Sequence, residues 1–193
     1  MAAMIPRCKV LVTRSVPYLV SALKARAPNV EFDVYEEAGK HITRDELLKR
    51  VQGCTGLLCL LTDGPIDDAV LDAAGAGLKV VSTLSVGHNH IDVAACRARG
   101  VAVGNTPGVL DEATAELAVA LTLAAARRVP QASASVADGT WGTWTPFEYC
   151  GAGLSRATVG VAGMGRIGAT YARMMAGGFD AKILYWPVHA KIP

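Results

Sequence analysis

Short runs of apolar, often β-branched residues alternate with helix-like segments through the first hundred residues, and this alternation constrains the fold more than any other feature. The predicted strands are residues 9–13, 30–35, 56–61, 78–84 and 101–103. Ser15 and Pro17 predict the start of a helix that runs to about Ala27, and Thr43 with Glu46 has capping-box spacing. Strands and helices that alternate at this interval build βαβ units, so we expect a parallel sheet.

The pattern changes after residue 104. A turn cluster at residues 105–108 precedes a long alanine-rich helix, predicted over 111–128, which has acidic residues at its start and arginines at its end. Its small apolar side chains predict burial, either in the core of this chain or against a second subunit. A shorter helix over 130–137 follows. We therefore place a domain boundary between residues 106 and 107.

Composition excludes several classes of protein. The 193 residues are 51% apolar and carry a net charge of +2, which argues against disorder, nucleic-acid binding and a polybasic membrane binder. The longest charge-free apolar stretch, 117–126, is about half of what spans a bilayer. The N-terminus has no long apolar segment, and the five cysteines are odd in number with no C-x-x-C pair. We expect a cytoplasmic protein with reduced thiols.

A glycine motif gives the clearest chemical signal. Residues 158–162 read as a strand, GMGRIG follows at 163–168, and a helix begins within it. In this context Gly163 permits a tight turn, Gly165 lets the backbone approach a pyrophosphate, and Gly168 allows close packing of helix and strand. The motif predicts a dinucleotide site at the helix N-terminus, the alternative being a purely structural glycine turn.

The next predicted strand, 182–185, bears on the choice of cofactor. An acidic residue after it would bond the ribose 2′-hydroxyl of NAD, but Trp186 follows and Asp180 lies before the strand. No acid there repels a 2′-phosphate, which weakly favours NADPH over NADH. Lys191 offers a positive charge, although a lysine near a terminus is usually only solvated.

A second candidate loop follows the buried strand 78–84. Ligands of open α/β sheets bind beyond the carboxyl ends of the strands, and a glycine turn there presents backbone N–H groups to an anion. Val86 and Gly87 occupy that position, the alternative being a plain turn. His88 and His90 lack a nearby third ligand, so we expect no metal, and no nucleophile–base arrangement is evident.

Four segments carry a family resemblance: LKVVSTLSVG at 78–87, NTPGVLDEATAELA at 105–118, WGTW at 141–144 and VGVAGMGRIG at 159–168. Through them, over about residues 9–185, the chain resembles the D-2-hydroxyacid dehydrogenases, most closely those that reduce glyoxylate and hydroxypyruvate. The resemblance implies an α/β fold with a flavodoxin-like parallel-sheet substrate domain, 1–106, followed by the start of a Rossmann dinucleotide-binding domain, 107–193. It also implies a homodimer and NAD(P)H-dependent reduction of a 2-keto acid to the D-2-hydroxy acid.

The resemblance also assigns site residues. By likeness, the backbone amides of Val86 and Gly87 bind the substrate carboxylate, and Trp144 reaches toward the active site of the neighbouring subunit. The cofactor loop is Gly163, Gly165, Arg166, Ile167 and Gly168, of which the middle three contact the pyrophosphate.

Two departures from the family pattern stand out. Val188 lies where NADP-preferring members have an arginine that holds the 2′-phosphate. The family's catalytic arginine, glutamate and histidine correspond to positions beyond Pro193, and none of His41, His88, His90 and His189 matches that histidine. We therefore expect this chain to be a truncated form that is inactive alone. The alternative to an enzyme is a binding protein that forms mixed dimers with full-length subunits, or a dinucleotide-binding scaffold like the related co-repressors.

Overall fold

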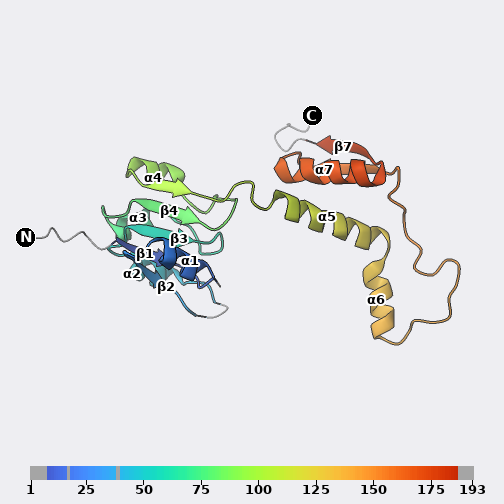
Figure 1. Cartoon of the computed structure of the whole chain (residues 1–193), viewed down its shortest axis with the longest axis horizontal. Helices are drawn as coiled ribbons and strands as arrows, with labels where there is room; N and C mark the ends of the chain where they lie inside the picture. Colours follow the sequence, from blue (N-terminus) through green and yellow to red (C-terminus); the bar gives the residue numbers. More distant parts are fainter. Residues whose placement is uncertain (1–7, 17, 38–39, 187–193) are drawn as a thin grey trace, which may run out of the picture. The chain divides into compact units, whose positions relative to one another are not determined.

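A computed structural model describes residues 8–16, 18–37 and 40–186. The chain divides into two compact units, Met1–Pro107 and Gly108–Pro193, and each is considered by itself (Figure 1). The sequence arguments that used Pro17, Val188, His189 and Lys191 concern residues outside the described ranges.

The first unit is built on a five-stranded parallel sheet. Its strands are β1 Cys8–Val12, β2 Val30–Val34, β3 Gly56–Cys59, β4 Val80–Thr83 and β5 Ala102–Gly104. They pair in the order β2-β1-β3-β4-β5, and every pair is parallel. This order is that of the flavodoxin-like doubly wound folds, so the predicted α/β class and parallel sheet are confirmed.

The helices of this unit are α1 Leu19–Arg26, α2 Arg44–Arg50, α3 Asp68–Ala74 and α4 Val93–Ala98. Side chains cap the N-termini of α2, α3 and α4, whereas α1 has no side-chain cap. The Thr43 hydroxyl accepts the Glu46 N–H at 3.3 Å, as its spacing predicts, and Asp92 caps α4 in the same way. The predicted start of α1 at Ser15 is wrong. Ser15 instead donates its N–H to the Tyr35 carbonyl at 3.0 Å, and α1 begins after Tyr18, whose φ is 63°.

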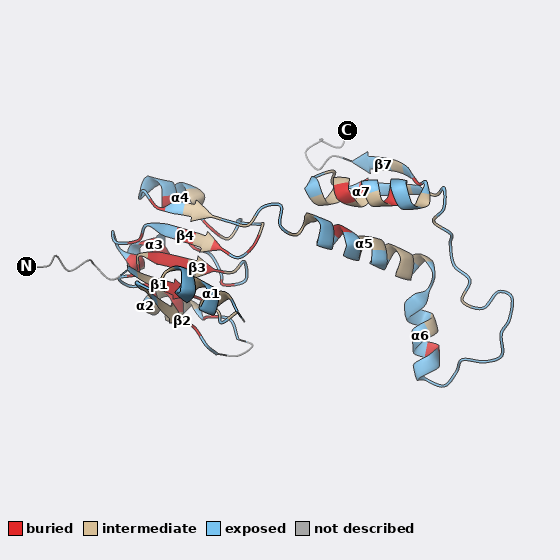
Figure 2. Cartoon of the chain, viewed as in Figure 1, coloured by how far each residue is buried: buried red, intermediate tan, exposed pale blue. Residues whose placement is uncertain are grey.

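The core of the first unit lies around the central strands. Leu11 of β1, Leu57 of β3 and Val81 of β4 are buried together with Leu47 of α2 and Val70 of α3 (Figure 2). Strand β3 has neighbours on both sides in the sheet, and its side chains are buried on one face and partly buried on the other, so its sequence reads as a continuous apolar run. This rigid centre supports the loops at the carboxyl ends of β3 and β4.

The second unit contains three helices and two strands: α5 Asp111–Ala126, α6 Val129–Ala137, β6 Thr158–Ala162, α7 Arg166–Phe179 and β7 Lys182–Trp186. The strands β6 and β7 form a two-stranded parallel sheet. Helix α7 packs against α5, where Thr122 and Tyr171 share a hydrogen bond of 2.9 Å between their hydroxyls.

Much of the apolar surface of the second unit is exposed. On α5 only Ala115 is fully buried, whereas Leu117 and Leu121 are each 60% exposed (Figure 2). Trp144 and Phe147 are also exposed, because two strands and three helices offer too little surface to cover them. Burial of α5 in the core of the chain, one of the two expectations from sequence, is therefore not found within this unit.

Within residues 8–16, 18–37 and 40–186, no helix is long and apolar enough to cross a membrane. All five cysteines are free thiols, of which Cys54, Cys59 and Cys96 are buried.

Candidate functional site

In the loop after β4, the backbone carbonyl groups accept hydrogen bonds from the loop itself and from the segment after β5. The Ser85 hydroxyl donates to the Gly87 carbonyl at 2.7 Å, and the Asn105 side-chain amide donates to the Val86 carbonyl at 2.8 Å. The Ser85 carbonyl accepts the Thr106 N–H at 2.9 Å. Three successive carbonyls are thus fixed by residues at the carboxyl ends of the neighbouring strands β4 and β5.

The same loop leaves its N–H groups free. Among the described residues, neither the Val86 nor the Gly87 N–H has a hydrogen-bond partner. Gly87 is exposed, and a Cβ built on it would meet no atom within 4 Å. Two unpaired N–H groups beside open space form the kind of backbone concavity that binds a carboxylate. The geometry therefore suits the predicted role of Val86 and Gly87.

Sequence reasoning missed Asn105, which holds the Val86 carbonyl. Its signal was available in principle, because Asn105 directly follows β5, and β5 pairs with β4. Parallel strands end at the same edge of the sheet, so polar residues after adjacent strands lie close together.

The histidines near this loop differ in environment. His88 is exposed, whereas His90 is half-buried, with its Nε2 3.7 Å from the Cys59 sulfur. Burial lowers the pKa of His90, and the negative charge of Asp63 only partly opposes that effect. Burial also raises the pKa of the Cys59 thiol to about 12, so Cys59 stays protonated and is a poor nucleophile. Across the described residues, no group of three His, Cys, Asp or Glu side chains could hold a metal ion.

The glycine loop of the second unit lies between β6 and α7. Gly163 has a φ of 98°, in the left-handed region that favours glycine, and its N–H donates to the Trp186 carbonyl at the end of β7 at 2.8 Å. A Cβ on Gly168 would overlap the Gly163 carbonyl oxygen, so Gly168 must be glycine for α7 to pack this closely on the turn. These two glycines are explained by the fold alone.

Gly165 has no such structural explanation. Its φ is −75°, which any residue adopts, and a Cβ there would meet nothing within 4 Å. It stands at the N-cap of α7, where no side chain caps the helix, so the N–H groups of the first turn at Arg166 and Ile167 remain available. Open space in front of free helix N–H groups fits a pyrophosphate, and this observation favours a dinucleotide site over a structural turn.

The surroundings of the loop include one charged contact and one apolar cavity. The Arg166 guanidinium lies 3.3 Å from an Asp111 carboxylate oxygen, at the first turn of α5. A cavity of about 350 Å³ is lined by the ends of β6 and β7, including Ala162, Leu184 and Tyr185. No carboxylate lines this cavity, in agreement with the absence of an acid after the second strand in the sequence.

The predicted site residues fall into both units. Val86 and Gly87 belong to the first, and the glycine loop and Trp144 belong to the second. Trp144 follows α6 and is 81% exposed. Its neighbour Trp141 stacks on Tyr149 with ring centroids 5.2 Å apart, and the Arg128 guanidinium lies over Tyr149.

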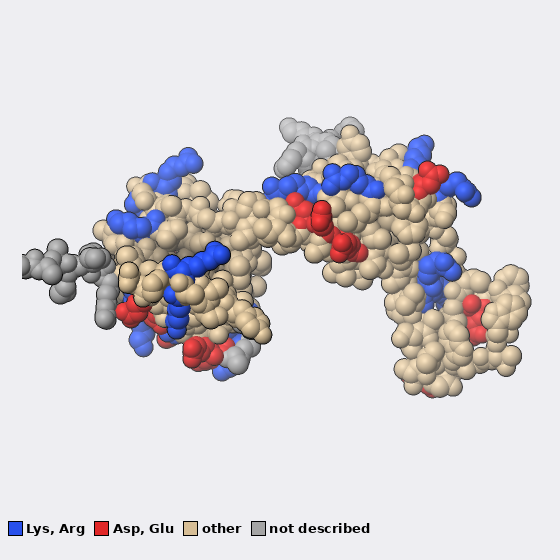
Figure 3. All heavy atoms as spheres, in the orientation of Figure 1, with Lys and Arg blue, Asp and Glu red and all other residues tan. Residues whose placement is uncertain are grey.

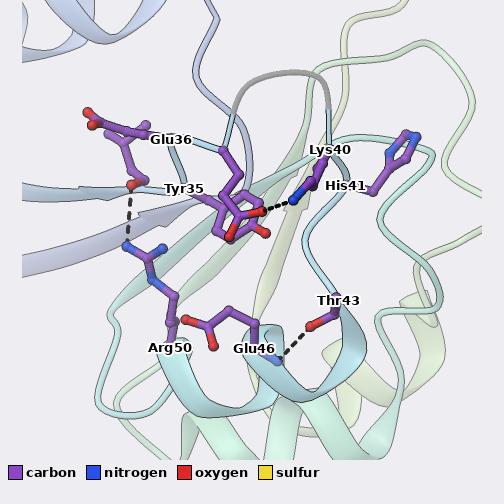
Figure 4. Close-up of a pocket in the computed structure, with 9 residues that line it drawn as sticks. Tyr35, Glu36, Lys40, His41, Thr43, Glu46 and Arg50 are labelled. Carbon is purple, nitrogen blue, oxygen red and sulfur yellow. Dashed lines mark hydrogen bonds and ion pairs between the residues drawn. The ribbon is translucent and has the colours of Figure 1, made fainter.

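A larger cavity, of about 730 Å³, lies elsewhere in the first unit, between the end of β2 and α2 (Figure 4). It contains none of the predicted site residues. The ammonium group of Lys40 pairs with Glu37 at 3.2 Å, and Arg50 donates to the Val34 carbonyl at 3.3 Å. Because these lining groups satisfy one another, cavity size alone is a poor guide to the functional site here.

Comparison with known proteins identifies the protein family to which this chain is similar. A sequence model of the D-isomer specific 2-hydroxyacid dehydrogenase catalytic domain matches residues 3–172. The human glyoxylate reductase/hydroxypyruvate reductase is 46% identical over 167 residues, which are 86% of this chain and 50% of that protein. A glyoxylate reductase of Thermofilum pendens is 43% identical over 195 residues, covering 97% of this chain and 56% of its own.

A solved structure gives the same result for the fold. The TT0316 protein of Thermus thermophilus matches with a TM-score of 0.85 and 42% identity, covering 96% of this chain and 57% of that one. The chain spans about half the length of the curated relatives it matches.

Proposed function

Because this chain belongs to the D-isomer specific 2-hydroxyacid dehydrogenase family, we propose that it supplies the carboxylate-binding loop and the dinucleotide-binding loop of a 2-keto acid reductase. The observation that carries the proposal is the state of the backbone at two loops. Val86 and Gly87 offer unpaired N–H groups, and Gly165 leaves open space before the uncapped N-terminus of α7.

The substrate class follows from the chemistry of the first loop. Two unpaired backbone N–H donors can bind a carboxylate and leave the adjoining keto group free to react. The names of the relatives, glyoxylate reductase and hydroxypyruvate reductase, support glyoxylate or hydroxypyruvate as the 2-keto acid, with the D-2-hydroxy acid as product.

The cofactor we propose is a nicotinamide dinucleotide, held at its pyrophosphate by Gly165, Arg166 and Ile167. When bound, it supplies the hydride for the keto carbon. The described part of β7 ends in Tyr185 and Trp186 and offers no carboxylate to repel a 2′-phosphate. This supports NADPH as a cofactor at least as good as NADH.

We further propose a cytoplasmic dimer, formed with a second copy or with a longer member of the family. The exposed Leu117 and Leu121 on α5 and the exposed Trp144 support an interface in the second unit. Free thiols at all five cysteines are typical of a reducing compartment.

A second candidate function is dinucleotide and substrate binding without turnover. The environment of His90 favours it, because burial lowers the pKa of this histidine and its Nε2 lies 3.7 Å from the Cys59 sulfur. Such a protein would act through its dimer partners.

Calorimetric titration of the full 193-residue chain with NADPH and with NADH tests the proposal. We expect saturable binding of both, with NADPH bound at least as tightly as NADH. Absence of binding by either dinucleotide would contradict the proposed function. A tenfold preference for NADH would contradict only the choice of cofactor.

A further inference from the structure

Asp111 and Arg166 connect the first turns of two helices. Asp111 is the first residue of α5 and Arg166 is the first residue of α7, and their side chains meet at 3.3 Å between Oδ2 and Nε. Figure 3 shows acidic side chains over α5 beside basic side chains over α7. The contact therefore joins the start of α7, next to the glycine loop, to α5, a helix that is not part of the β6–α7–β7 motif.

The two partners are not equally exposed. The Asp111 side chain is 16% exposed, whereas the Arg166 side chain is 59% exposed. Asp111 is therefore the more enclosed partner of the pair, and it can hold the more exposed arginine. The contact uses only the Nε of Arg166, and among the described residues its two terminal amino groups have no partner.

This arrangement orients the guanidinium. An exposed arginine otherwise samples many rotamers, and ordering them on ligand binding has an entropic cost. A carboxylate paired with Arg166 on its Nε side restricts where the guanidinium lies before the ligand arrives, and it leaves both terminal amino groups available for phosphate oxygens.

The negative charge of Asp111 also repels a phosphate ligand, which opposes the benefit of an ordered Arg166. The Asp111 charge is paired with Arg166 at an exposed rim, where solvent and salt screen its longer-range repulsion. The ordering of Arg166 acts over the 3.3 Å contact, where salt screens less than it does over the longer distance to the ligand. We therefore expect ordering to dominate at physiological ionic strength.

We propose that Asp111 is a positioning residue that holds Arg166 ready to bind the dinucleotide pyrophosphate. The inference rests on the proposed function, because it assumes that a dinucleotide binds at the glycine loop. It goes further by assigning a role to a residue on α5 that does not belong to the glycine motif.

The test is a double-mutant cycle read by calorimetric titration with NADPH at about 150 mM salt. Asp111→Ala should raise the Kd about fivefold, which corresponds to about 1 kcal/mol. Arg166→Gln should also weaken binding, but adding Asp111→Ala to Arg166→Gln should change the Kd no further. Non-additivity of this kind identifies a residue that acts through Arg166, and a loss of general stability would not produce it.

Two further variants control the experiment. Glu112→Ala removes an exposed acid from the same turn of α5 and should leave the Kd unchanged. Asp111→Asn keeps the shape of the side chain and should weaken binding in the same direction if Asp111→Ala fails to fold. Unchanged or tighter binding by the Asp111 variants, or equal effects of Asp111→Ala with and without Arg166, would overturn the inference while the wild-type chain still binds NADPH. Failure of the wild-type chain itself to bind would instead overturn the proposed function, and the inference with it.

Discussion

Gly165 at the N-cap of α7 and Gly168 in its first turn lie three residues apart and are glycine for different physical reasons. At Gly168 a Cβ would overlap the Gly163 carbonyl oxygen, whereas at Gly165 a Cβ would meet no protein atom within 4 Å. One position is thus constrained by the fold and the other is free of such constraint. The contrast allows binding and stability to be separated by mutation.

For Gly165→Val we expect loss of dinucleotide binding with little loss of stability. The valine side chain would occupy the open space before the first turn of α7, where we place the pyrophosphate. Its φ of −75° is compatible with valine. Calorimetric titration with NADPH should show no saturable binding, and the thermal midpoint should stay within a few degrees of wild type. Equal affinity in the two proteins would remove the cofactor from this loop.

For Gly168→Ala we expect a loss of stability. The added methyl group would force α7 away from the turn at Gly163 and loosen its packing on β6. Overpacking of this kind costs about 1–3 kcal/mol. Thermal or urea unfolding would measure the change, and a variant as stable as wild type would show that the helix shifts without cost.

At the residue scale, the sequence was informative where a residue type has one dominant reason to occur. The motif GMGRIG predicted a turn, an open position and a close approach, and the structure shows this geometry at Gly163, Gly165 and Gly168. The roles of Asn105 and Asp111 could not be predicted in the same way. Their partners, the Val86 carbonyl and the Arg166 guanidinium, become neighbours only through strand pairing and helix packing.

At the scale of elements, Asp33 joins three parts of the first unit. It lies on the edge strand β2 and forms an ion pair of 3.1 Å with Lys9 of β1, and a second ion pair with Arg50 of α2. Burial alone would raise the pKa of Asp33, but the hydrogen bonds from Arg50 and Lys9 outweigh burial and lower it. The charged form is therefore favoured by the folded state.

This shift predicts a specific response to acid. A carboxyl group whose pKa is lower in the folded state contributes stability above its unfolded pKa of about 4, and that contribution is lost as the pH falls through the folded pKa. We expect Asp33→Asn to cost about 2 kcal/mol at pH 7. The variant should also lose less stability than wild type between about pH 5 and pH 3. Urea unfolding across that range is the measurement, and parallel pH profiles would contradict the assignment.

Most elements could be predicted because local signals and tertiary context agree. The capping side chain of Thr43 predicted the start of α2, and the apolar run at residues 56–61 predicted β3, which ends two residues earlier at Cys59. The start of α1 could not be predicted. Ser15 is a good cap by type, but its backbone N–H is used by the carbonyl of Tyr35, a contact 20 residues away in sequence.

At the scale of the whole molecule, the two units differ in completeness. The first buries a continuous core, whereas the second leaves Leu117, Leu121 and the face of β7 exposed (Figure 2). An apolar helix pattern such as that of α5 predicts burial but does not say against what. The small apolar side chains of α5 predicted burial, which the second unit by itself does not supply, and burial against a second subunit stays a prediction.

The last prediction is that a protein of these 193 residues binds its ligands but does not reduce glyoxylate or hydroxypyruvate at an enzymatic rate. Reduction of a keto group requires a proton donor within hydrogen-bond reach of the carbonyl oxygen, and backbone N–H groups at Val86 and Gly87 do not release protons. His90 is an unsuitable donor, because burial lowers its pKa and its Nε2 lies 3.7 Å from the Cys59 sulfur.

The measurement is oxidation of NADPH, followed by absorbance, with saturating hydroxypyruvate and protein free of any longer member of the family. We expect turnover well below about 1 per second, the lower end of ordinary enzymes. Faster turnover would mean that a histidine beside the loop serves as the acid. His88→Gln and His90→Gln would then identify it, because only the variant that lacks the donor should lose the rate while the thermal midpoint and NADPH affinity stay unchanged.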